Sequence, residues 1–143
     1  MTFEVKVQGE ERVERSAARL SPDAQRALAK EKRRLALNLA RRLRRAVIGR
    51  SKGRMGTKVR PDIHQQGDRV IADNSSGMLF GTEFGMNRKS GWYADERFRN
   101  SPNLQYFRHQ GDGYWWNPTI RAAKPDADAA VQRALDDAVS HWG

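Results

Sequence analysis

Apolar residues recur at helical spacing along one long segment in the first half of the chain. They fall on a stripe about 120° wide at 100° per residue, made of Leu28, Leu35, Ala36, Leu39, Leu43, Ala46 and Val47. Ser21-Pro22-Asp23 supplies an N-cap residue, a proline at the first helical position and an acid in the first turn. Gly49 is a natural C-terminal stop. The pattern predicts a helix over Pro22–Ile48, roughly 40 Å long.

Alternation of apolar and polar residues predicts short strands on both sides of this helix. Phe3, Val5 and Val7 alternate with polar neighbours and predict the first strand. A hairpin is predicted around Gly67-Asp68, and Pro61 places its first strand at a sheet edge. The predicted strands are 3–7, 57–64, 69–73, 78–84, 104–107 and 114–117, and a short charged helix is predicted over 10–20.

A second apolar stripe at helical spacing closes the sequence, and Asp126, Asp136 and Asp137 lie on the opposite, outer side. The stripe consists of Ala127, Val131, Ala134, Leu135, Ala138, Val139 and Trp142. Pro125 stands at the predicted first position of this helix, which runs to Trp142 with Asp126 and Asp128 in its first turn. Two helices and several short strands predict an α+β fold. We expect a small, mostly antiparallel sheet packed by the long helix and the C-terminal helix, in one domain spanning residues 1–143.

Composition separates the two halves of the 143-residue chain and argues that they pack on each other. The net charge is +10, but residues 1–60 carry 18 Lys and Arg against 6 Asp and Glu, while Phe3 is the one aromatic residue before Phe80. There is no cysteine, which excludes disulfides and thiolate metal sites. No apolar run approaches the roughly 20 residues that span a bilayer, and the start of the chain has no signal-peptide pattern. We therefore expect a cytoplasmic product without membrane contact.

The residues that could support catalysis do not form a recognisable site. His64, His109 and His141 have no ligand spacing to one another or to a carboxylate pair. Glu83 follows a predicted strand and Asp112 lies in a turn, so each has a simpler structural interpretation than general acid–base chemistry. Nucleophile-elbow, phosphate-loop and dinucleotide motifs are absent from the sequence. We expect neither enzyme activity nor a cofactor or metal ion.

The side of the long helix opposite its apolar stripe is strongly basic. Two apolar residues, Leu37 and Ile48, lie within this side, where a monomer gains nothing from burying them. Three interpretations stay open: a solvated surface, pairing with an acidic partner subunit, and contact with a nucleic-acid backbone that reads no base sequence. The basic face consists of Lys30, Arg33, Arg34, Arg41, Arg44 and Arg45.

Three consecutive aromatic residues follow a Gly-Asp-Gly turn in the second half. Tyr114, Trp115 and Trp116 could stack on single-stranded bases or fill the core, and Pro118 bars a central strand beyond them. Alternation along a strand places Tyr114 and Trp116 on one face and Trp115 on the other. This pattern assigns Trp116 to the core and Trp115 to a subunit interface.

The order of the short motifs resembles a known family. Gly81-Thr-Glu-Phe-Gly85, a variable loop, Gly113-Tyr-Trp-Trp-Asn-Pro-Thr-Ile-Arg121 and a terminal helix follow one another in the chain. This layout, over roughly residues 1–143, resembles the tail-terminator and head–tail joining (tail completion, neck) proteins of long-tailed double-stranded DNA phages. In that family the segment matching Glu83-Phe84-Gly85 ends a sheet strand. Structural or interface positions carried over are Glu83, Phe84, Gly85, Tyr114, Trp115, Trp116 and Pro118.

The resemblance implies a structural role in the virion. Members are small α+β subunits that form a ring, commonly a hexamer, between the head connector and the tail tube. The expected partners are therefore other copies of the chain, the tail-tube protein and a head-connector or stopper protein, in the virion neck after assembly in the host cytoplasm. The alternative function is a sequence-nonspecific nucleic-acid-binding module that uses the Arg-rich helix.

Overall fold

The computed structural model describes four stretches of the chain, and they form an α+β fold, as predicted. The stretches are residues 2–51, 60–74, 79–84 and 115–142. Their elements follow one another along the chain as β1 (Phe3–Lys6), α1 (Glu11–Ala17), α2 (Pro22–Ser51), β2 (Asp62–Gln66), β3 (Arg69–Asp73), α3 (Leu79–Phe84) and α5 (Trp116–Trp142).

The three strands form an antiparallel sheet in the order β1-β3-β2. Val5 lies opposite Val70, and Ile63 lies opposite Ala72, so these four apolar residues share one face, while Ile71 lies on the other face opposite Glu4. Gly67 adopts a φ of 61° in the turn between β2 and β3, a conformation that glycine takes without steric cost. The hairpin prediction is confirmed. So is the edge position of the strand that follows Pro61.

Helix α2 begins where its N-cap sequence predicts but ends later. The Ser21 hydroxyl oxygen accepts a hydrogen bond from the Ala24 backbone N–H at 3.2 Å, which satisfies one of the free donors of the first turn. The prediction that Gly49 stops the helix is wrong, because α2 continues to Ser51. Gly49 does not adopt the positive φ of a C-terminal glycine stop. Among the described residues, no atom outside the helix lies within 4 Å of where its Cβ would be.

Helix α5 begins nine residues earlier than predicted and passes through Pro125. The predictions of a strand over 114–117 and of a helix start at Pro125 are therefore wrong for the described residues 115–125. Trp116, Thr119, Ile120 and Ala123 recur at helical spacing and are buried or half-buried, so they continue the stripe of the later turns. Burial of this first part offsets the hydrogen bond that proline removes from a helix interior.

Leu79–Phe84 is also helical, within the segment 78–84 where a strand was predicted. Leu79, Thr82 and Glu83 are buried, and their spacing of three and four residues places them on one side of helix α3. A strand would have placed Thr82 and Glu83 on opposite faces. Residues 52–59, 75–78 and 85–114, which include the predicted strand 104–107, lie outside the described part of the chain.

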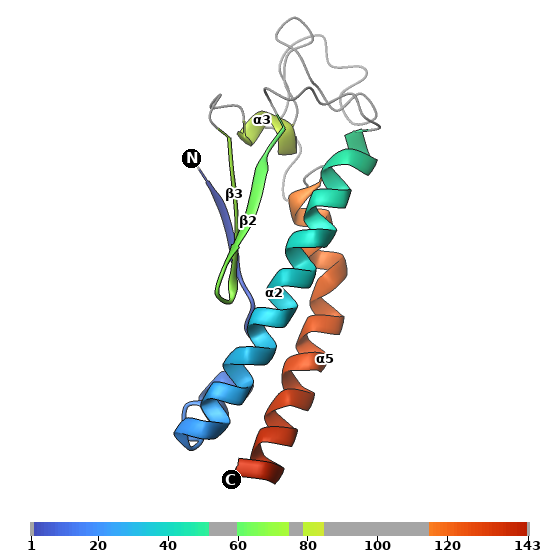
Figure 1. Cartoon of the computed structure of the whole chain (residues 1–143). Coiled ribbons are helices and arrows are strands. Elements are labelled where there is room, and N and C mark those ends of the chain that lie inside the picture. The colour runs from blue at the N-terminus through green and yellow to red at the C-terminus, as the bar shows by residue number, and fades with distance from the viewer. Residues whose placement is uncertain (1, 52–59, 75–78, 85–114, 143) are drawn as a thin grey trace, which may run out of the picture.

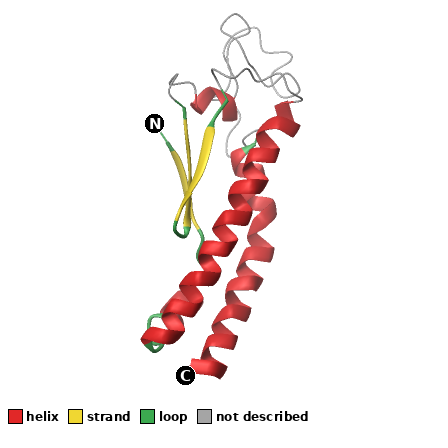
Figure 2. Cartoon of the chain, in the orientation of Figure 1, coloured by secondary structure: helices red, strands yellow, loops and turns green. Residues whose placement is uncertain are grey.

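Helices α2 and α5 run side by side in opposite directions, and the sheet packs against α2 (Figure 1). Figure 2 shows the two long helices as one layer and the three strands as the other. The core lies between these layers, with Leu43, Val70, Trp115 and Val131 fully buried in it. One side of each long helix is left facing solvent. Those two outer sides carry exposed charged residues.

Candidate functional site

Glu83 holds the first turn of α5 from a distant part of the sequence. Its carboxylate is 1% exposed. One oxygen accepts the backbone N–H groups of Trp115 at 2.7 Å and Trp116 at 3.0 Å, and the other accepts that of Asn117 at 2.7 Å. Pro118 follows and has no N–H to satisfy. A negative charge at a helix N-terminus is favourable, so Glu83 acts as the capping group that the local sequence lacks.

Thr82 adds a second link between α3 and the start of α5. Its hydroxyl donates to the Leu79 carbonyl at 2.6 Å and accepts the Trp115 indole N–H at 3.1 Å. Phe3 of β1 packs on both tryptophans, with ring centroids 6.0 Å from Trp115 and 5.4 Å from Trp116. The two indoles meet edge to face at 5.6 Å, a favoured geometry.

The assignment of Trp115 to a subunit interface is therefore wrong. Trp115 is 0% exposed and Trp116 is 6% exposed, so both belong to the core. The reason is the local structure: adjacent residues differ by 100° at a helix start and by 180° in a strand, so both indoles face inward. Tyr114 and Gly85, like the side chain of Phe84, lie outside what the structure describes.

The motif residues that sequence analysis singled out are thus mainly structural in the described part of the chain. Glu83, Trp115 and Trp116 join α3, α5 and β1 into one buried unit. Pro118 is half-buried and lines a shallow groove of 470 Å³ between α2 and α5, beside Arg42 and Arg45. The Glu83 carboxylate is engaged by backbone donors, which leaves the Glu83–Asp112 acid–base pair without support. Asp112 itself lies outside the described residues.

The predicted basic face is present on the outer side of α2, with all six of its cations exposed. Arg34 forms an ion pair with Glu31, and Arg44 donates to the Ile63 carbonyl at 3.1 and 2.7 Å. In the described part of the chain, no ion pair involves the other four members, which we call the open cations: Lys30, Arg33, Arg41 and Arg45.

Two aliphatic side chains lie among these cations. Leu37 is 36% exposed and Ile48 is 52% exposed, although comparably large aliphatic residues on the opposite side of α2, such as Leu43, are buried. Both were predicted to lie outside the internal core, and their exposure agrees with that prediction. The basic face of α2 therefore combines open cations with two exposed aliphatic side chains.

The outer side of α5 carries three exposed carboxylates, Asp126, Asp136 and Asp137, which we call the acidic face. No ion pair among the described residues involves them. Val139 lies beside them and is 51% exposed. The sequence pattern predicted that these acids face outward, and they do. Val139 was missed, because the periodicity placed it in the buried stripe.

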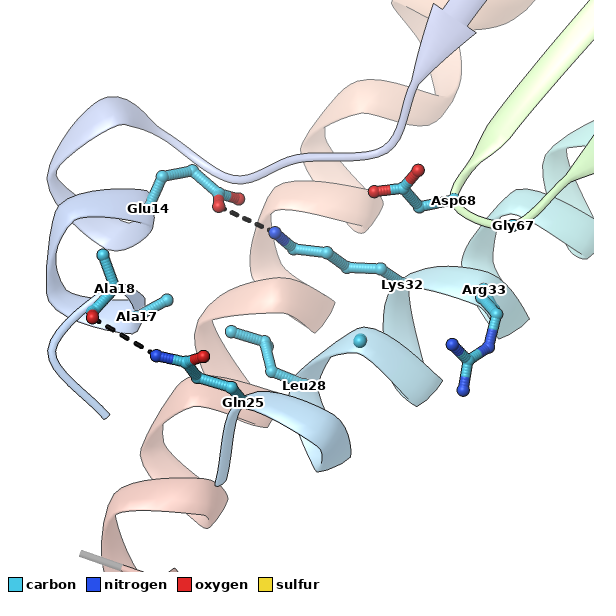
Figure 3. Close-up of a pocket in the computed structure, with 10 residues that line it drawn as sticks. Glu14, Ala17, Ala18, Gln25, Leu28, Lys32, Arg33, Gly67 and Asp68 are labelled. Atoms are coloured by element: carbon cyan, nitrogen blue, oxygen red, sulfur yellow. Dashed lines mark hydrogen bonds and ion pairs between the residues drawn. The ribbon is translucent and has the colours of Figure 1, made fainter. Parts of the chain in front are cut away.

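A groove of 560 Å³ lies between α1, α2 and the turn at Gly67 (Figure 3). Across it the Lys32 ammonium contacts the Glu14 carboxylate at 2.7 Å, and Glu14 also accepts the Gly9 backbone N–H at 2.7 Å. Burial raises the pKa of Glu14, but these hydrogen bonds and the nearby lysine charges hold it below its ordinary value of 4.5. The two charges neutralise each other, so the groove wall is an internal link between α1 and α2. Sequence analysis did not predict this pair.

The described residues contain neither a candidate metal-binding cluster nor a candidate membrane-spanning helix. No group of three or more His, Asp or Glu residues in the described stretches could hold a metal ion. None of the helices there is long and apolar enough to cross a bilayer. His64 and His141 lie apart on β2 and α5, with the His141 ring bonded to the Asp137 carbonyl. His109 lies outside the described residues.

Comparison of the chain with protein-family models, curated proteins and solved structures found no match.

Proposed function

We propose that this chain is a non-enzymatic structural subunit of the phage neck, a tail terminator that assembles as a ring between the tail tube and the head connector. The order of its motifs and terminal helix resembles that family. An α+β domain with one long helix and a C-terminal helix is the kind of subunit the resemblance implies. The partners proposed are further copies of the chain, commonly six to a ring, with the tail-tube protein and a connector or stopper protein at its two ends.

One observation favours a role in assembly: the exposed Leu37 within the basic face of α2. A partly exposed leucine gains free energy when its remaining apolar surface leaves water, about 25 cal/mol per Å². In the monomer, 36% of the surface of Leu37 stays exposed to water. Contact with a neighbouring subunit would bury this remaining apolar surface.

A second candidate function, sequence-nonspecific binding of nucleic acid, is favoured by the four open cations. A row of cations along a helix can follow a phosphate backbone with an affinity that falls steeply with salt. Leu37 argues against this candidate, because phosphates and sugars offer it little apolar surface. We therefore rank assembly first.

The test compares two substitutions at adjacent exposed positions of α2. Leu37→Asp and Asn38→Asp each add one negative charge, but only the first removes an exposed aliphatic side chain from the basic face. Sedimentation velocity of both variants and of the unaltered chain measures assembly, and thermal melting measures folding. We expect Leu37→Asp to weaken assembly while its melting temperature stays near that of Asn38→Asp.

Two results contradict the proposal. Equal assembly of both variants would remove Leu37 from the interface. Selective loss of monomer stability in Leu37→Asp would place this leucine in the internal core.

A further inference from the structure

The outer sides of the two long helices carry opposite charges. We propose that the basic face of α2 in one copy docks on the acidic face of α5 in the next copy, an inference that rests on the proposed self-assembly and names its two surfaces. The open cations provide one half of the contact, and Asp126, Asp136 and Asp137 provide the other.

Neither set of charges forms an ion pair within the described part of one subunit, although the Gln132 side chain donates a hydrogen bond to the Asp136 carboxylate at 3.1 Å. Lys30 and Arg45 are separated by roughly 22 Å along α2, and Asp126 and Asp137 by roughly 16 Å along α5, at 1.5 Å per residue. Both rows therefore extend over several turns on straight, rigid elements. Complementary charge across an interface fixes register and disfavours wrong partners.

Arg133 is a cation on the outer side of α5, and it is also exposed. The pKa of Glu31 on α2 is lowered first by its hydrogen bond from Arg34 and further by the charge of Arg133. Arg133 therefore lies near Glu31, a carboxylate that already forms an ion pair with Arg34. The three carboxylates of the acidic face outnumber this one cation, so the outer side of α5 stays net negative.

Exposed aliphatic side chains occur together with the charges, and they favour a protein over a nucleic acid as the binding partner. Leu37 and Ile48 lie among the cations, and Val139, three residues after Asp136, is 51% exposed. Docking the acidic face on the basic face covers Leu37 and Ile48 with protein, whereas a nucleic-acid backbone offers these two side chains little apolar surface. A second copy of this chain presents both the charge and the apolar surface required.

The two surfaces lie on different helices of the subunit. A contact in which the basic face of one copy meets the acidic face of the next can repeat from copy to copy, and such a repeat closes into a ring when the rotation between copies allows it. The proposed contact is therefore of the type that a ring needs.

The experiment reverses charge on each surface in turn and then on both. The variants are Arg41→Glu with Arg45→Glu, Asp136→Lys with Asp137→Lys, and the four changes combined. Arg15→Glu with Arg19→Glu is the matched control, because it makes the same charge change at exposed positions that belong to neither face. Sedimentation equilibrium measures self-association, circular dichroism checks folding, and fluorescence anisotropy with a short duplex at low and physiological salt measures DNA binding.

We expect each one-sided reversal to weaken self-association at least about tenfold. The combined variant should regain most of it, because both signs are exchanged and attraction is restored. The control should associate like the unaltered chain.

The possible failures are distinguishable. If self-association is unchanged in all three variants, or if the combined variant does not recover it, the inference is overturned and the ring proposal remains. A chain that stays monomeric at every concentration overturns both. In that case, salt-sensitive duplex binding that is lost in Arg41→Glu with Arg45→Glu assigns the basic face to nucleic acid.

Discussion

At the scale of single residues, Glu83 has the largest structural consequence. Three backbone N–H groups at the start of α5 point to its two carboxylate oxygens, and such donors are costly to bury without an acceptor. The helix therefore begins at Trp116 because a residue on α3 supplies the cap. This explains why the two short motifs of the sequence occur together in one molecule.

Glu83→Ala should destabilise the protein by about 3 to 5 kcal/mol, because two buried backbone donors and one partly buried donor lose their acceptor. Glu83→Gln should cost less, since one amide oxygen remains but the charge and one acceptor are lost. Chemical denaturation measures both, with Glu11→Gln, on the exposed side of α1, as the control. A Glu83→Ala protein as stable as this control would contradict the capping role.

The tryptophans show how far single residues could be predicted. The lack of large side chains in the first half predicted that at least two of the three adjacent aromatic residues fill the core, and Trp115 and Trp116 do. Trp115 was assigned to an interface because three adjacent aromatics resemble a strand. The information that corrects this lies 32 residues away, at Glu83, and a local pattern does not contain it.

At the scale of elements, periodicity predicted α2 and the hairpin well because both follow from local sequence. The stripe of α2 and the turn at Gly67 need no distant partner. α3 and the first turns of α5 depend on tertiary contacts, which is why local reasoning predicted strands there. The helix start predicted at Pro125 was wrong for the same reason. Buried residues before and after Pro125 stabilise the helix, so this exposed proline lies within α5 and not at its first turn.

The two described glycines with open surroundings should respond oppositely to alanine. Gly49 has helical backbone and free space, so Gly49→Ala should stabilise by about 0.5 to 1 kcal/mol. Gly67 has φ 61°, so Gly67→Ala should destabilise by about 1 kcal/mol. Thermal melting of the pair measures this. Destabilisation by Gly49→Ala would contradict the continuation of α2 through this residue.

The link between α1 and α2 should make stability depend on pH. Because the pKa of folded Glu14 is lowered from 4.5, its stabilising effect is fully present above that value and is lost as pH falls through the folded pKa. Melting temperatures of the unaltered chain and of Glu14→Gln should therefore differ at neutral pH and converge in acid. The control is Glu11→Gln on the same helix. A gap that persists or widens in acid would contradict the role of the ion pair.

At the scale of the whole molecule, one layer of two antiparallel helices buries its inner side and presents two charged outer sides (Figure 1). The sequence predicted both charged sides from helical spacing, since exposure on a long helix follows from the position of its apolar stripe. It did not predict Val139 as exposed, because the stripe on α5 is narrower than periodicity indicated. The two outer sides are the basis of the proposed assembly.

The central claim, that this chain is a ring-forming structural subunit, is tested most directly by native mass spectrometry of the unaltered chain over a range of concentrations. We expect a single higher oligomer of fixed subunit number that grows with concentration at the expense of the monomer. A closed ring stops at that number because no docking surface is left unpaired. A spectrum that contains only monomer at every concentration, or an unlimited ladder of masses, would contradict the account.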